Sequence, residues 1–298
     1  MGESWSSDQP GRYEDLARFF GHQTTEAHDR SDVESIGEAF DLIEEDFGRF
    51  LDESLSPRGA ESLYDLVGQA EPPQQGGVAV DVGCGDGRDA VQLALRFGLR
   101  VHGIDPSAAN IAAARERAAA QGLTDRLDLQ VGRAEGIPLP DQSVDVVWCK
   151  EVLTFTELEA AMSEFHRVMR PTGFGVLYQV VTGPAMSEDE ARWFNSHEAG
   201  FGPSHGLRPA DVEAAIATAG LVVRQRVDYA SEWGEAGQER SGAAGRRLIH
   251  AARLLRQPDR YIARYGETNY QIMLVDCLWH VYRMIGKLWG VAFVVERS

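Results

Sequence analysis

A buried strand that runs directly into a glycine-rich turn is the feature that most constrains the fold of this chain. The apolar stretch at residues 78–82 is followed by three glycines at alternate positions, Gly83, Gly85 and Gly87, and then by a helical pattern. Glycine lacks a Cβ, so such a turn can bring its backbone close to a ligand. The helix that follows directs unpaired N–H groups and its positive dipole end toward that ligand. The pattern favours an α/β fold with a nucleotide-like cofactor at the turn.

The glycine spacing distinguishes between cofactors. Dinucleotide-binding turns use G-x-G-x-x-G, whereas this chain has G-x-G-x-G two residues after Asp81. The segment D-V-G-C-G-D-G resembles motif I of the class I S-adenosylmethionine-dependent methyltransferases that act on small molecules. The resemblance implies that Asp81, Gly83, Cys84, Gly85 and Gly87 line the methionine side of the cofactor, with Asp81 near its amino group. A tight strand-to-helix turn without a ligand is the alternative.

The elements that follow extend this resemblance. Residues 99–105 predict a second strand ending in Asp105, whose carboxylate can accept hydrogen bonds from both ribose hydroxyls. Pro106 and Ser107 open the next helix, with Ser107 as its N-cap. Residues 127–132 alternate apolar and polar side chains, as a third strand does. The resemblance implies that Asp105 and Pro106 belong to the cofactor site.

The segment at residues 133–148 looks like the family's adenine-side loop followed by its fourth strand. The resemblance implies that Ala134 and Glu135 face the adenine. Arg133 stands where the family usually has an aspartate, and its side chain has only hydrogen-bond donors. It cannot accept from the adenine amino group, so we expect Arg133 to be no ligand unless it stacks on the ring.

The fourth strand is expected to end at Cys149 and Lys150, where open α/β sheets place ligands beside the reversal in strand order. The resemblance implies that both residues contact the cofactor. It also implies a Rossmann-like seven-stranded sheet of order 3-2-1-4-5-7-6 whose last strand is antiparallel. The remaining expected elements are a helix at 158–169, a turn at 170–173 and strands at 175–181, 221–227 and 289–296.

Two helical regions flank the predicted core, and we expect them to select the substrate. The first contains amphipathic stretches at residues 13–20 and 36–55. The second contains an apolar stripe at helical spacing, which we interpret as packing onto the sheet; its members are Ile272, Val275, Trp279 and Tyr282. The predicted organisation is an N-terminal helical cap at 1–77, a cofactor-binding core at 78–230, a helical insertion or lid at 231–287 and the last core strand within 288–298.

Composition narrows the class of protein. The chain has 298 residues and 43% hydrophobic content, enough for a large core. It lacks an apolar run of 18 residues and begins with polar residues, which favours a cytoplasmic protein without a membrane span. Acidic residues outnumber basic ones 46 to 29, which disfavours a nucleic-acid partner. The three cysteines are widely spaced, which argues against a disulfide framework, and none has metal-ligand spacing.

The chemistry that the resemblance implies is methyl transfer from S-adenosylmethionine to an O, N or C atom of a small organic acceptor. Alignment and exclusion of water are the main requirements, and a base is needed only when the acceptor loses a proton. Candidate bases are His205, His280, Glu151 and Tyr178, and Asp276 could orient His280 from one helical turn away. Analogy suggests secondary-metabolite biosynthesis, by a monomer or a homodimer.

Two alternatives stay open. A protein with this fold could bind S-adenosylmethionine in a regulatory role without transferring methyl groups, because one fold hosts many functions. Nicotinamide-dependent oxidoreduction is the other alternative, which the glycine spacing disfavours. No metal site is expected in either case.

Overall fold

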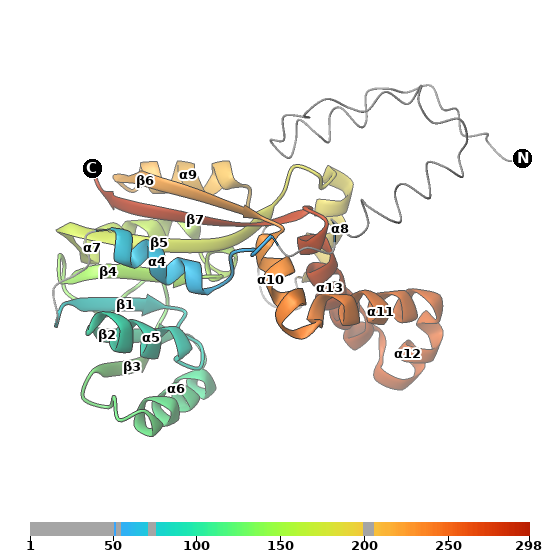
Figure 1. Ribbon diagram of the computed structural model, residues 1–298, viewed down its shortest axis with the longest axis horizontal. Coiled ribbons are helices and arrows are strands. Elements are labelled where there is room, and N and C mark those ends of the chain that lie inside the picture. Colours follow the sequence, from blue (N-terminus) through green and yellow to red (C-terminus); the bar gives the residue numbers. More distant parts are fainter. Residues whose placement is uncertain (1–50, 52–54, 71–75, 199–205) are drawn as a thin grey trace, which may run out of the picture. The chain divides into compact units, whose positions relative to one another are not determined.

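The structure of this protein is a computed structural model, and it describes residues 51, 55–70, 76–198 and 206–298. Residues 56–298 are built on a seven-stranded sheet of order β3-β2-β1-β4-β5-β7-β6 (Figure 1). Strands β1 to β5 pair in parallel, whereas β7 is antiparallel to both β5 and β6. The expected fold class and strand order are therefore confirmed. The strands are β1 (Val78–Val82), β2 (Arg100–Asp105), β3 (Leu127–Val131), β4 (Val144–Lys150), β5 (Met169–Thr182), β6 (Leu221–Ala230) and β7 (Leu288–Arg297).

Helices cover both faces of the sheet. Each strand sends alternate side chains to opposite faces, so two separate apolar clusters form. The first face carries α4 (Glu61–Gln69), α5 (Arg88–Phe97) and α6 (Ala108–Ala120), and the second carries α7 (Leu158–Val168) and α9 (Pro209–Thr218). A short 3-10 helix, η3 (Leu153–Phe155), follows β4, and α8 (Glu188–Glu198) follows β5.

The local signals at the first crossover work as the sequence predicts. Helix α5 begins directly after Gly87, which has φ +79°. Ser107 caps α6, since its hydroxyl oxygen accepts a hydrogen bond from the backbone N–H of Asn110 at 3.3 Å. These caps fix where both helices point, and both helices begin at the carboxyl ends of β1 and β2.

The predicted turn at residues 170–173 is wrong, because β5 already begins at Met169. Met169 pairs with Val144 at the start of β4, and the register shifts between Val144 and Val146. Arg170 also forms an ion pair with Asp145 at 2.6 Å. The next pair is Phe174 with Val146, so residues 170–173 bulge from the ladder with β4 while the strand continues on both sides.

The insertion between β6 and β7 is helical, as expected. It contains α10 (Glu232–Ser241), α11 (Ala243–Arg256), α12 (Pro258–Tyr265) and α13 (Glu267–Met284). A small apolar cluster holds the last three helices together, and its buried members are Ala251, Leu254, Tyr270, Leu274 and Cys277. From the predicted stripe, Val275 is fully buried in the cluster on the first face of the sheet, and Trp279 and Tyr282 pack against that cluster. The stripe thus joins α13 to the sheet.

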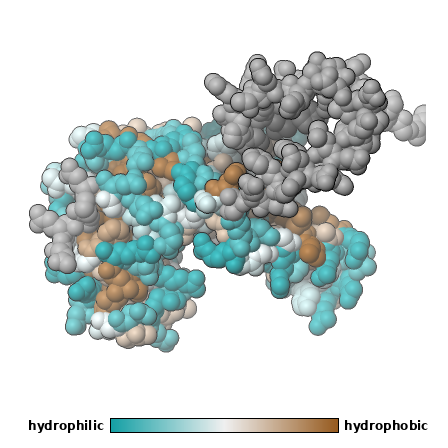
Figure 2. Space-filling model, in the orientation of Figure 1, coloured by the Kyte–Doolittle hydropathy of each residue, from teal (hydrophilic) through white to brown (hydrophobic). Residues whose placement is uncertain are grey.

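Hydrophilic side chains cover most of the described surface that Figure 2 shows, with hydrophobic patches between them. Within the described ranges, no helix is both long and apolar enough to cross a membrane. The amphipathic stretches expected at 13–20 and 36–55 lie outside the described residues, apart from residues 51 and 55.

Replacing Gly87 with alanine should destabilise the fold more than the same change at Gly122. Both glycines have positive φ, +79° and +66°. A Cβ on Gly87 would lie 2.9 Å from the Cβ of Ala114, whereas a Cβ on Gly122 would meet no described atom within 4 Å. Both variants carry backbone strain, and only Gly87→Ala adds overpacking, which costs about 1–3 kcal/mol. Urea unfolding measures the difference, and equal losses of unfolding free energy would contradict this steric account.

Candidate functional site

The glycine turn lies at the carboxyl end of β1 and is tied to β2. The backbone N–H groups of Gly83 and Cys84 both donate to the carbonyl oxygen of Ile104, at 2.8 and 2.9 Å. A Cβ on Gly83 would collide with Val152 at 2.2 Å, whereas a Cβ on Gly85 would meet no atom of the described residues within 4 Å. The middle of the turn therefore faces open space, as a turn that lies against a ligand must.

Asp105 braces this turn from the end of β2. Its side chain is almost fully buried and accepts three hydrogen bonds. Oδ2 accepts from the N–H of Gly85 at 3.0 Å, and Oδ1 accepts from the N–H of Ser107 at 2.9 Å and from Asn110 Nδ2 at 3.0 Å. Pro106 stands between Asp105 and Ser107 in the sequence, and the carboxylate fixes the glycine turn relative to the start of α6.

Asp81, on β1 and also at the turn, carries an unsatisfied acceptor. Asp81 is 2% exposed, and its Oδ2 has no hydrogen-bond partner within the part of the chain that the structure describes. Burial raises the pKa of Asp81 well above its ordinary value, and the neighbouring charge of Asp89 adds to the shift, while Lys150 and the backbone N–H of Ala90 oppose it. A buried acceptor without a donor is costly. A ligand that brings a donor or a cation would satisfy it.

Lys150 belongs to a network that the sequence did not reveal. Its Nζ forms an ion pair with Asp89 Oδ2 at 2.5 Å, and Tyr64 Oη donates to the other oxygen of Asp89 at 2.5 Å. The ring of Tyr64 stacks on Trp148 with centroids 5.1 Å apart. Helix α4 is thereby joined to the ends of α5 and β4. The sequence signal for this network was Asp89, an acidic residue in the first turn of α5.

The adenine-side loop is held by its own side chains. Ala134 is buried, and Glu135 Oε1 accepts from the backbone N–H of Glu157 at 2.9 Å, at the start of α7. Arg133 is exposed and lies 3.4 Å from Glu135 Oε2. The carboxylate of Glu135 thus already has structural partners. Cys149 is fully buried at the end of β4, which raises the pKa of its thiol and keeps it protonated.

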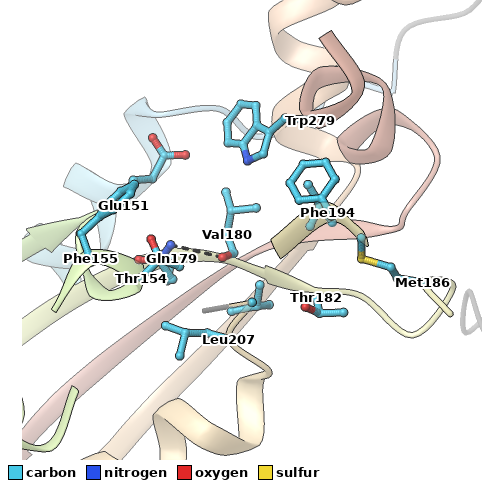
Figure 3. Close-up of a pocket in the computed structure, with 13 residues that line it drawn as sticks. Glu151, Thr154, Phe155, Gln179, Val180, Thr182, Met186, Phe194, Leu207 and Trp279 are labelled. Atoms are coloured by element: carbon cyan, nitrogen blue, oxygen red, sulfur yellow. Dashed lines mark hydrogen bonds between the residues drawn. The ribbon is translucent and has the colours of Figure 1, made fainter. Parts of the chain in front are cut away.

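A cavity of about 290 Å³ opens beyond the ends of β4 and β5 (Figure 3). Its walls come from the segment after β4, the end of β5, helices α8 and α13, and the start of β7. The lining is mainly apolar with a few polar groups, namely Glu151, Thr154, Phe155, Gln179, Val180, Val181, Thr182, Met186, Phe194, Gly206, Leu207, Trp279 and Leu288. Gln179 is held by its Oε1, which accepts from the N–H of Leu153 at 2.9 Å.

Glu151, one of the candidate bases, lies in the wall of this cavity. Its backbone has φ +59°, a left-handed conformation that costs about 1–3 kcal/mol in residues other than glycine and is typical of functional sites. Its N–H donates to the carbonyl oxygen of Tyr178 at 2.8 Å. Oε1 is buried without a hydrogen-bond partner among the described residues, and Nη1 of Arg283 lies 3.8 Å away.

The surroundings of Tyr178 suit a residue that accepts a hydrogen bond and do not suit a base. The side chain is fully buried outside the cavity wall, its Oη accepts from Arg283 Nη2 at 3.2 Å, and its ring lies 4.1 Å from that of Trp233. Burial raises the pKa of the phenol, which keeps it protonated and unsuited to act as a base. The sequence analysis did not identify Arg283 as a site residue. Its charge, four residues after Trp279 on a helix rich in aromatic residues, was a usable signal.

Of the two histidine candidates, the structure describes His280, which does not line the cavity. His205 lies outside the described residues. His280 is half-buried on α13, and burial lowers its pKa, so its imidazole is neutral near pH 7. Asp276, the expected orienting carboxylate, forms an ion pair with Arg247 at 2.7 Å. Across the described ranges, no cluster of three metal-ligating side chains occurs.

Part of this chain is similar to known methyltransferases. Residues 80–177 match the family described as "Methyltransferase domain". Methyltransferase GfsG of Streptomyces halstedii is 33% identical over 117 residues, which are 39% of this chain and 41% of that protein. The 27-O-demethylrifamycin SV methyltransferase of Amycolatopsis mediterranei is 28% identical over 222 residues, 70% of this chain and 82% of that protein. The chain thus spans less than half the length of the first relative and most of the second.

A solved structure supports the fold. The structure of geranyl diphosphate methyltransferase in complex with SAM aligns with a TM-score of 0.60 at 20% identity, over 90% of this chain and 93% of that one. At this identity the likeness establishes the shared architecture and leaves substrate and reaction open.

Asp81→Asn should stabilise the ligand-free protein at neutral pH. A carboxyl group whose pKa is raised by folding binds more protons in the native state than in the unfolded state, so its contribution to stability falls as pH rises from the ordinary aspartate value of 3.8 toward the raised value. An amide has no such titration. Urea unfolding at acidic and neutral pH should show the variant gaining on the wild type as pH rises. A pH-independent difference would mean that the Asp81 pKa is not raised.

Proposed function

We propose that this chain, a member of the class I S-adenosylmethionine-dependent methyltransferases, transfers the methyl group of S-adenosylmethionine to an O, N or C atom of a small organic acceptor. One observation carries the proposal. The unsatisfied buried oxygen of Asp81 adjoins a turn whose middle glycine faces open space. The cofactor has an ammonium group on its methionine part, and that group would donate to Asp81.

The cofactor would follow the ends of β1, β2 and β4. In this proposal Gly83, Cys84, Gly85 and Gly87 pass beneath the methionine part, Asp105 and Pro106 hold the ribose, and Ala134 and Glu135 border the adenine. The glutamate contributes through the loop that it stabilises, because its carboxylate caps α7. Cys149 and Lys150 border the methyl group, and the ion pair of Lys150 with Asp89 fixes that border.

S-Adenosylmethionine, when bound, supplies a methyl group on a sulfonium that accepts the electron pair of the breaking C–S bond as the acceptor's lone pair forms the new bond. The tasks left to the protein are alignment, exclusion of water and removal of a proton where the acceptor loses one. The apolar cavity walls would exclude water. Among the candidate bases that the structure describes, Glu151 lies in the cavity wall, so we assign proton removal to it.

The acceptor would be a small organic molecule, consistent with a cavity of about 290 Å³. One relative carries a name that fits a role in secondary-metabolite biosynthesis, the 27-O-demethylrifamycin SV methyltransferase of Amycolatopsis mediterranei. We extend that role to this chain as part of the proposal.

Gly85→Val should abolish S-adenosylmethionine binding, whereas Gly122→Val should leave it intact. Both positions have positive φ and open space at the Cβ, so the two variants carry comparable backbone strain. Only the side chain at position 85 would occupy the proposed cofactor site. Isothermal titration calorimetry with S-adenosylmethionine and S-adenosylhomocysteine measures the dissociation constants. Equal affinities in the two variants would exclude the turn as the cofactor site.

Turnover is tested with S-adenosylmethionine labelled in its methyl group and a panel of phenols, amines and enolisable acceptors. Asp81→Asn should weaken cofactor binding roughly tenfold to hundredfold, because hydrogen bonds to charged groups contribute about 1.5–3 kcal/mol. Asp128→Asn, at an exposed position on β3, serves as the control. Cofactor binding without label transfer to any acceptor would favour a non-catalytic binding protein over the proposed enzyme.

A further inference from the structure

We propose that the acceptor presents a hydrogen-bond donor, a hydroxyl or an amine, to Glu151, and that Arg283 is the positioning residue that holds this carboxylate ready. The inference rests on the proposed function and concerns the same cavity. It narrows the acceptor to a molecule with an apolar body and an O–H or N–H group at its reacting atom.

The first argument is the unmet acceptor on Glu151. Oε1 is buried and no described residue donates to it, although the side chain forms part of the cavity wall. A carboxylate oxygen without a donor in such a site is costly. An acceptor molecule with an O–H or N–H group would supply the missing donor. An unactivated alkene carbon or a methyl ether could not.

The second argument is the placement of Arg283. This side chain is 8% exposed and lies on α13, with its guanidinium 4.4 Å from the ring centroid of Trp279 and 5.8 Å from that of Trp233. Its Nη1 lies 3.8 Å from Glu151 Oε1, close enough for charge attraction and too far for a hydrogen bond. Arg283 therefore balances the carboxylate charge and leaves its lone pairs available.

The third argument is that one residue fixes both members of the pair. The carbonyl oxygen of Tyr178 accepts from the backbone N–H of Glu151, and its phenolic oxygen accepts from Arg283. A residue of β5 thus holds the strained backbone of Glu151 and the guanidinium of Arg283 in one arrangement. The insertion thereby contributes to the site through Arg283 and through Trp279, which lies with Glu151 at one end of the cavity (Figure 3).

The rest of the cavity defines the body of the acceptor. Its other walls are largely apolar, from Phe155, Val180, Met186, Phe194, Leu207 and Trp279. A flat or branched apolar skeleton would bury surface against these side chains. Apart from Glu151, the lining residues carry no charge, so a charged group on that skeleton would have no counter-charge among them. The favoured class is a lipophilic alcohol, phenol or amine.

The test measures binding of probe molecules to the full chain saturated with S-adenosylhomocysteine. The probes are 2-naphthol and 2-naphthylamine, compared with 2-methylnaphthalene and 2-methoxynaphthalene, which have similar shapes and no donor. Wild-type protein should prefer the donor-bearing probes by roughly tenfold or more. Glu151→Met should reduce that preference to about twofold or less, and Glu151→Gln, which keeps a neutral acceptor oxygen, should retain part of it.

The role of Arg283 is tested with the same probes. Arg283→Met keeps the length of the side chain and removes its charge, and it should lose most of the donor preference. Arg283→Lys restores a charge and should recover part of that preference, which a purely structural role would not predict. Arg253→Lys, an exposed arginine on α11, is the control and should bind all probes as the wild type does.

The outcomes separate this inference from the function on which it rests. Failure to bind S-adenosylhomocysteine would count against the proposed function itself. Normal S-adenosylhomocysteine binding with no binding of 2-naphthol, or with equal binding of 2-naphthol and 2-methylnaphthalene, would overturn the inference alone. Because S-adenosylhomocysteine affinity also reports folding, a variant that binds it normally and loses the donor preference supports the proposed role of Glu151 or Arg283.

Discussion

A carboxylate oxygen buried without a donor, that of Asp81 on β1, is the interaction around which the site is organised. The sheet holds Asp81 in place through pairing with β2 on one side and β4 on the other. Its exposed fraction is only 2%. Such an arrangement costs stability and persists only because the two apolar clusters on the sheet faces hold the strand. It becomes favourable once a ligand brings a donor.

A second unsatisfied carboxylate, that of Glu151, follows β4, the strand that pairs in parallel with β1. Val82 pairs with Cys149, so the glycine turn and the segment that begins with Glu151 leave the sheet side by side. The close approach of Gly83 to Val152 reflects the same register. In our account Asp81 receives the donor of the cofactor and Glu151 receives the donor of the acceptor. The methyl group would pass between them, at the point where the strand order reverses.

The sequence predicted those parts of the fold that depend on local signals. The glycine turn, the Ser107 cap and the alternating strands each depend on a few neighbouring residues, and the family resemblance supplied the strand order. The turn expected at 170–173 is instead a bulge within β5, because Met169 and Phe174 on either side of it both pair with β4. Contacts between distant segments, such as Tyr64 with Asp89 or Arg283 with Glu151, left only weak traces in the sequence. These contacts depend on how the helices pack on the sheet.

Proton release on cofactor binding tests the central claim most directly. If the carboxyl group of Asp81 is protonated in the free protein and receives the ammonium of the cofactor, binding must expel that proton. Calorimetric titration with S-adenosylhomocysteine in buffers of different ionisation enthalpy, across the acidic to neutral range, counts the protons released. The account predicts release by the wild-type protein that is absent from Asp81→Asn. Identical proton exchange in the two proteins would contradict it.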